Sequence, residues 1–130
     1  MKVIPVMVPK SANPIKYLID KIKSEGLVGG FVIGIGTFKR AKIGILKNGT
    51  YDVKEVRGRE NYMLEVTSLL GNYMRVGEDV SIHLHVTLTS SHNEALGGHL
   101  VEAEVGALLE VALIEVGDLS EVFAHRVKST

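Results

Sequence analysis

The sequence predicts an α+β fold, a single domain in which a mostly antiparallel β-sheet is flanked by one or two helices. Three observations support this. One stretch with helical periodicity occurs early, short runs of valine, isoleucine and glycine follow it, and an Asn-Gly pair marks a hairpin among those runs. The length of 130 residues suits one hydrophobic core, and no low-complexity tract or repeat divides the chain. We therefore expect one domain over residues 1–130.

The first element is predicted to be a strand at the edge of the sheet. Residues 2–8 are rich in valine and isoleucine, and Pro9 bounds them. Pro5 lies inside this run, and a proline cannot donate a hydrogen bond to a neighbouring strand. An edge position tolerates that missing donor, so we expect the strand to have a neighbour on one side only.

A helix with both ends marked comes next. Asn13 can cap it, Pro14 suits the first helical position, and Gly26 can close it. Apolar residues recur between these ends at the spacing of one helix face: Ile15, Leu18, Ile19 and Ile22. This face should pack on the sheet.

The remaining chain is predicted to be mostly sheet. Asn48-Gly49 tolerates the positive φ angles of a type I′ turn, so it should join residues 41–46 to residues 50–56. Further strands are expected at residues 62–70 and 80–89, and one or two within residues 99–116. Consecutive strands after one early helix favour antiparallel pairing over a doubly wound parallel sheet.

Composition excludes several classes of function. Fifteen basic and fifteen acidic residues give a formal net charge of +0, which offers a nucleic-acid binder no general attraction to phosphate. Without cysteine there is no disulfide, thiolate zinc site or thiol nucleophile. Residues 1–14 do not form a signal peptide, and no apolar run approaches the ~18 residues of a membrane span. We expect a cytoplasmic protein without a membrane partner.

The predicted strand at residues 80–89 carries two histidines on one face. Apolar and polar residues alternate along it, so His83 and His85 stand side by side on the polar face. His99 follows Gly97-Gly98 and is the natural third ligand of a metal ion, with Glu102 or His92 as a further ligand. Three histidines with an open fourth position lower the pKa of a bound water. The expected ion is zinc or another divalent transition metal.

Two other interpretations of these histidines stay open. A polar sheet face can carry histidine simply because it lies in solvent or at an interface. Alternatively, the three side chains could line a subunit-bounded pocket for an anion or small molecule, with neutral imidazoles donating and accepting hydrogen bonds. Whether a metal site would serve binding or catalysis is also open; in an enzyme, Glu102 could act as an acid or a base.

Other motifs point away from nucleotide chemistry and nucleophilic catalysis. Gly34-x-Gly36 is followed by Lys39 where a dinucleotide fingerprint needs a third glycine, so no nucleotide cofactor is expected. Arg57-Gly58-Arg59 resembles a minor-groove arm but has acidic neighbours, which favours a solvated hairpin loop. No serine lies in a Gly-x-Ser-x-Gly elbow. The acidic residues of the last strand region are interpreted as solvated or interface charges: Glu102, Glu104, Glu110 and Glu115.

Several motifs together resemble a known family. They are LEVTSLLGN at residues 64–72, HLHVTL at residues 83–88 and GGHL at residues 97–100. The glycine-rich residues 27–36 and the pair Glu110-Val111 are similar to the family's early strand and late Glu-Val pair. On these motifs, which cover about residues 3–116, the chain is identified as a member of the plant and prokaryote conserved (PPC) domain family.

This resemblance implies an α+β fold assembled as a homotrimer. In plants the domain follows AT-hook motifs in nuclear DNA-binding proteins and mediates association, whereas prokaryotic members are usually the bare domain. The resemblance therefore implies self-association and a role in DNA binding or regulation. This chain has no separate hook, and Arg57-Gly58-Arg59 lacks the proline that completes a hook core. The family's histidine cluster carries over to His83, His85 and His99.

Overall fold

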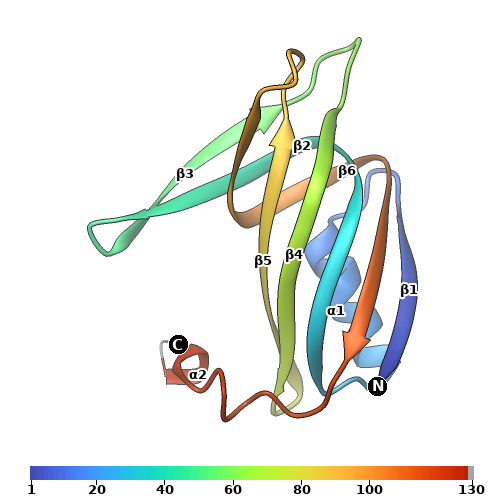
Figure 1. The fold of residues 1–130 in the computed structure, drawn as a ribbon, viewed down its shortest axis with the longest axis vertical. Helices are drawn as coiled ribbons and strands as arrows, with labels where there is room; N and C mark the ends of the chain where they lie inside the picture. The colour runs from blue at the N-terminus through green and yellow to red at the C-terminus, as the bar shows by residue number, and fades with distance from the viewer. Residues whose placement is uncertain (129–130) are drawn as a thin grey trace.

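The fold was determined as a computed structural model, which describes residues 1–128 (Figure 1). Within these residues, six strands form one sheet, and a first helix lies against it with a short second helix near the C-terminus. The elements are β1 Lys2–Pro9, α1 Pro14–Ser24, β2 Gly29–Lys47, β3 Thr50–Arg57, β4 Leu64–Val76, β5 Asp79–Thr89, β6 Ala95–Glu115 and α2 His125–Lys128. The α+β class predicted from the sequence is confirmed.

The sheet closes on itself. Its strand order is β1-β6-β5-β4-β2-β3, and β2 pairs with β6 as well. Strands β2, β4, β5 and β6 therefore form a ring of hydrogen-bonded neighbours, and every pairing within it is antiparallel. Register shifts in β2 let this long strand bend between its partners. β1 pairs with β6 alone within residues 1–128, so the predicted edge position is confirmed.

Helix α1 begins and ends where the sequence indicates. The side chain of Asn13 accepts hydrogen bonds from the N–H groups of Ile15 and Lys16. At the other end, Gly26 adopts a φ of 65°, and the N–H of Leu27 donates to the carbonyl of Ile22. Both caps satisfy backbone groups that the helix leaves unpaired, which fixes where α1 enters and leaves the sheet.

The predicted hairpin is present between β2 and β3. Asn48 and Gly49 have φ angles of 51° and 81°, as a type I′ turn requires. The β2–β3 end projects from the body of the domain (Figure 1). Its apolar side chains stay exposed, including Ile45, Leu46 and Tyr51.

Two strands are longer than predicted. β4 runs to Val76, although the predicted strand ends at residue 70. Gly71 instead lets β4 lie against β5, because a Cβ there would come within 1.9 Å of the carbonyl oxygen of His83. β6 is one continuous strand that begins before His99. Glycines in these strands permit close backbone contact and do not break them.

The core lies between α1 and the inner face of the sheet. Leu18 and Ile22 of α1 are fully buried, together with Phe38 of β2 and Leu109 of β6. Burying one such side chain contributes about 1.5–3 kcal/mol, so this layer supports the strands that carry the polar face. No helix within residues 1–128 combines the length and apolar character needed to cross a bilayer.

Candidate metal centre

Strand β5 presents its two histidines as its alternation predicts. Leu84, Val86 and Leu88 are buried in the core. His83 and His85 alternate with these residues along the strand and therefore project from the opposite face. The apolar half of the strand thus anchors the backbone from which both imidazoles extend.

His99 reaches the same place from β6. It is the direct cross-strand partner of His85 on one side and of Gly44 on the other. Gly98 permits this arrangement, because a Cβ there would lie 2.6 Å from the carbonyl oxygen of Gly44. The Gly-Gly pair therefore lets β6 fit closely between β5 and β2, and His99 follows directly.

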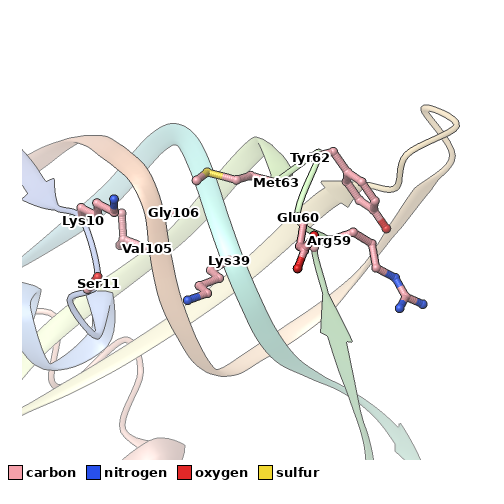
Figure 2. A pocket seen from close by; sticks show the side chains of 10 residues that line it. Lys10, Ser11, Lys39, Arg59, Glu60, Tyr62, Met63, Val105 and Gly106 are labelled. Atoms are coloured by element: carbon pink, nitrogen blue, oxygen red, sulfur yellow. The ribbon is translucent and has the colours of Figure 1, made fainter.

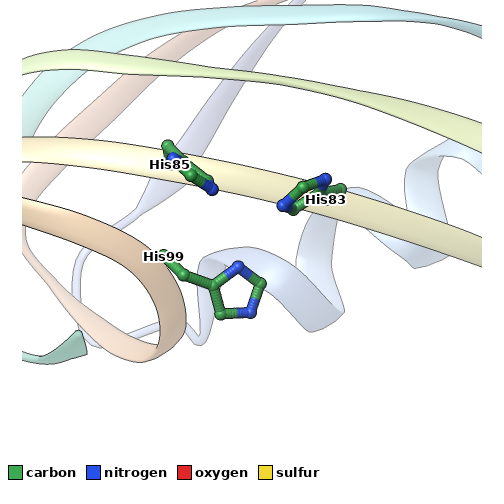
Figure 3. A group of neighbouring side chains, drawn as sticks. All are labelled: His83, His85 and His99. Atoms are coloured by element: carbon green, nitrogen blue, oxygen red, sulfur yellow. The ribbon is translucent and has the colours of Figure 1, made fainter. Parts of the chain in front are cut away.

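The three imidazoles form one cluster (Figure 3). One ring nitrogen from each histidine lies within 4.8 Å of the others. The ring centroids of His83 and His85 are 5.0 Å apart, and those of His83 and His99 are 5.3 Å apart. Two nitrogens on one zinc can be separated by at most about 4.2 Å, since each bond is about 2.1 Å. The three nitrogens must therefore move closer together to share one ion. The ring of Tyr51 stacks on His99 at 4.9 Å.

The cluster favours neutral imidazoles. Desolvation is the main cause that lowers the pKa of His83 and His99 below the ordinary value, and the neighbouring His85 lowers both further. The Nδ1 atom of His99 is buried and has no hydrogen-bond partner within residues 1–128. Neutral imidazoles offer lone pairs to a metal, and an unpartnered buried nitrogen is stabilised by any ligand that engages it. The residues present therefore fit a divalent metal ion.

Two further ligands suggested by the sequence are not brought to the cluster. Glu102 accepts a hydrogen bond of 3.0 Å from Arg40 and pairs with Lys42 at 3.5 Å. These cations lower the pKa of Glu102, so its charge is already compensated on the β2 side of β6. His92 lies in the β5–β6 loop, where its ring contacts the hydroxyl of Ser91.

Sequence reasoning missed Arg126, which lies beside the cluster. It hydrogen-bonds to the Oδ1 of Asn72 and, at 2.7 Å, to the Oγ of Ser81. Asn72 is the cross-strand partner of His83, and Ser81 precedes His83 by two residues on β5. The charge of Arg126 also lowers the pKa of His83. Ser81 lies on the polar face of β5, so the sequence indicated a hydrogen-bonding group there. Only the folded chain shows that Arg126 is its partner.

Glu115 is not the solvated or interface charge expected from its spacing. Its carboxylate accepts hydrogen bonds from the N–H groups of Val28 and Gly29, at 2.8 and 2.9 Å, and from the hydroxyl of Tyr73 at 3.1 Å. Burial and this carboxylate raise the pKa of Tyr73. Glu115 therefore ties β6 to β4 and to the start of β2. By contrast, Arg57 ends β3 and Gly58-Arg59 begins the β3–β4 loop, with both arginines exposed, as expected.

The profile of the Plants and Prokaryotes Conserved (PCC) domain matches residues 1–117. The chain belongs to this family. The match confirms the PPC resemblance seen in the sequence and contains all three clustered histidines. A search of curated proteins finds no match to the chain.

Solved structures are similar to this PPC domain over most of its length. A plant- and prokaryote-conserved protein of Pyrococcus horikoshii is 32% identical, with a TM-score of 0.80, covering 88% of this chain and 78% of its own. A protein of Bacteroides thetaiotaomicron named "putative DNA binding protein" is 26% identical, with a TM-score of 0.81 and coverages of 89% and 80%. A "metal-containing protein" of Archaeoglobus fulgidus is 26% identical, with a TM-score of 0.77 and coverages of 91% and 82%.

Proposed function

We propose that this PPC domain is a metal-binding protein in which His83, His85 and His99 hold zinc or a similar divalent transition metal. The observation that carries this proposal is the convergence of three imidazole nitrogens within 4.8 Å of one another. The lowered pKa of His83 and His99 and the unpartnered Nδ1 of His99 support it, because a metal needs neutral imidazoles. The similar structure from Archaeoglobus fulgidus, called metal-containing, adds support.

Each histidine has its own part in holding the ion. His83 and His85 come from one strand, so their backbone spacing is fixed, and His99 closes the site from β6. Tyr51 covers one face of the His99 ring and limits its rotation. A bound metal would act as a Lewis acid and would lower the pKa of a water at its open position.

Metal analysis of untagged protein tests the proposal. Protein purified without chelator should contain close to one transition metal per chain, and His83→Ala should remove it. The matched control is His92→Ala, because His92 lies outside the cluster. Metal-free protein that also fails to bind added zinc in titration calorimetry would rule the site out.

We further propose that the chain assembles as a homotrimer through an apolar area on the outer face of β2, β4 and β6. Five large side chains there are 38–56% exposed: Phe31, Ile33, Ile35, Leu70 and Leu108. Burying such an area between copies removes it from water. Leu70 is the cross-strand partner of His85, so this area borders the histidine cluster.

Light scattering coupled to size-exclusion chromatography tests the assembly. The chain should elute as a trimer at micromolar concentration, and Ile33→Glu should shift it toward monomer. Tyr17→Glu, on the exposed side of α1, is the control and should leave the trimer intact. A monomeric wild-type chain would refute the proposal.

DNA association is a second proposed role. It is favoured by the similar structure from Bacteroides thetaiotaomicron, which is named a "putative DNA binding protein". The net charge of +0 gives it no general electrostatic support. Fluorescence anisotropy with duplex DNA at about 50 and 200 mM salt provides the test, since phosphate contacts must weaken as salt rises. Failure to bind at the lower salt concentration would exclude this role.

A further inference from the structure

A second candidate site lies away from the histidines, in a cleft of about 480 Å³. Four separate parts of the chain form it: the β1–α1 turn, the middle of β2, the β3–β4 loop and the bend of β6. Figure 2 shows Lys10 on one side, with Lys39 and Met63 between it and the loop residues of the other side. The cleft shares no residue with the histidine cluster. Its volume falls within the ~300–1,000 Å³ typical of small-molecule sites.

Positive charge dominates this cleft. Its lining carries three cations, Lys10, Lys39 and Arg59, and one carboxylate, Glu60. Within residues 1–128, neither Lys10 nor Arg59 forms an ion pair. Lys39 has only a long contact of 3.9 Å with Glu104.

The charge of Glu104 is shared with a nearer cation. Its other oxygen lies 3.5 Å from the Nε of Arg40. The side chain of Lys39 is also 68% exposed, so it stays available to a ligand. An anion entering the cleft would thus meet cations that the protein has not already neutralised.

The rest of the lining is apolar and held in place. Val105 is buried, and Tyr62 and Met63 add an aromatic ring and a thioether. The N–H of Ser11 donates to the carbonyl of Val105 at 2.9 Å, which ties the β1–α1 turn to β6. Ser11 adopts a φ of 71°, a conformation that costs a non-glycine residue energy and marks a constrained turn.

Close packing also fixes the far wall. A Cβ on Gly106 would lie 2.6 Å from the Sδ of Met63, so Met63 rests directly on the β6 backbone. The N–H of Gly58 donates to the carbonyl of Lys39 at 2.9 Å and holds the loop against β2. The cleft is therefore formed before any ligand arrives, which reduces the ordering cost of binding.

We propose that this cleft binds a small organic anion, a carboxylate or phosphate joined to a flat apolar group. Lys10 and Lys39 contact the anionic group, and Met63 and Tyr62 contact the apolar group. A ligand that carries only an anionic group, or only an apolar group, would use only one half of the lining. An inorganic ion leaves the apolar wall unused, and a neutral aromatic leaves the cations unpaired.

Titration with phenyl phosphate and benzoate, followed by amide chemical shifts, tests this proposal. At least one should bind with a Kd below about 5 mM, with shifts at residues 10–11, 58–63 and 105–106. Affinity should fall as salt rises. Lys10→Met and Lys39→Met should each weaken binding about 10-fold or more, as expected for loss of a charge-assisted hydrogen bond. Lys16→Met, an exposed helix lysine outside the cleft, should leave binding unchanged.

Each contrary result identifies which part is wrong. Inorganic phosphate that binds as tightly as phenyl phosphate, or benzyl alcohol that binds as tightly as benzoate, would overturn the pairing of charge with apolar surface. Shifts confined to the histidine cluster, or binding insensitive to both lysine variants, would overturn the location. Duplex DNA that displaces phenyl phosphate and depends on the same lysines would assign the cleft to nucleic acid instead. Metal-free protein should bind these anions in the cleft equally well, because the cleft contains none of the three histidines.

Discussion

Two polar clusters on the sheet differ in how their charges and hydrogen bonds are satisfied. One centres on Arg40, which contacts Glu102 at 3.0 Å, Glu104 at 3.5 Å and Glu55 at 3.6 Å. The other consists of the three histidines, whose rings lie close together. Within residues 1–128, one buried ring nitrogen, the Nδ1 of His99, has no hydrogen-bond partner. The Arg40 cluster draws side chains from β2, β3 and β6, and the histidines come from β5 and β6.

The two clusters differ in how far the chain itself satisfies their polar groups. Around Arg40, one cation is matched by three carboxylates of the same chain, and Lys39 and Lys42 add further positive charge at 3.9 and 3.5 Å. Within residues 1–128 no carboxylate pairs with the histidine cluster, and desolvation lowers the pKa of His83 and of His99. A polar cluster that the chain satisfies stabilises the fold, whereas one that it leaves unsatisfied is available to a ligand.

The largest expected effect is on metal affinity at the histidine cluster. His99→Ala should reduce zinc affinity at least about 100-fold, beyond the 10–100-fold usual for outer-shell partners, because it removes a direct ligand. Calorimetric titration of chelator-treated protein measures this. The circular dichroism spectrum should be unchanged, since His99 packs on the outer side of the sheet. Unchanged zinc affinity would remove the distinction between the two clusters.

Arg40→Met should have the opposite pattern. It leaves Glu55, Glu102 and Glu104 facing one another without their shared cation, so Tm should fall while zinc affinity stays within about 2-fold of wild type. Arg59→Met is the matched control, because Arg59 forms no ion pair within residues 1–128. Equal Tm values for the two variants would show that the Arg40 cluster does not stabilise the fold.

Acidification should affect the two clusters in different pH ranges. In the metal-free chain the pKa of His83 and of His99 lies below the unfolded value of about 6.5. The unfolded state therefore takes up protons first, and stability falls as pH drops below about 6.5. The pKa of Glu102 is lowered from its ordinary value of 4.5, so the stability that Glu102 contributes is lost only below about that pH. Urea unfolding should give a smaller free energy of unfolding at pH 5.5 than at pH 7.5. His99→Asn should reduce this difference, and Arg40→Met should not.

The smallest effect is expected at the wall of the histidine cluster. Tyr51 stacks on His99 but offers no ligand atom to the group. Tyr51→Leu should therefore weaken zinc binding less than about 10-fold, by loosening the His99 ring. The same calorimetric titration measures it, with Tyr17→Leu as a control remote from the site. A loss as large as that of His99→Ala would mean that Tyr51 has a direct role.

The sequence predicted the clustering of the three histidines better than the partners of the nearby acidic residues. The alternation along β5 placed His83 and His85 on one face, and the glycine pair before His99 indicated a close approach of backbones. Glu102 could not be assigned correctly, because its partner Arg40 is 62 residues away and the register shift between β2 and β6 was not visible. Glu115 was misread for the same reason, since its partners are Val28, Gly29 and Tyr73.

The sequence by itself determined the local elements and their polarity. The caps of α1, the Asn48-Gly49 turn and the two-residue alternation of β5 depend on interactions between near neighbours, which residue type alone specifies. Only the tertiary structure decided which distant side chains meet. Pairing of β5 with β6 brought His99 to His85, and closing the sheet through β2 and β6 enclosed the cleft at Lys10 and Lys39. Such contacts depend on strand register and bends, which many residues set together.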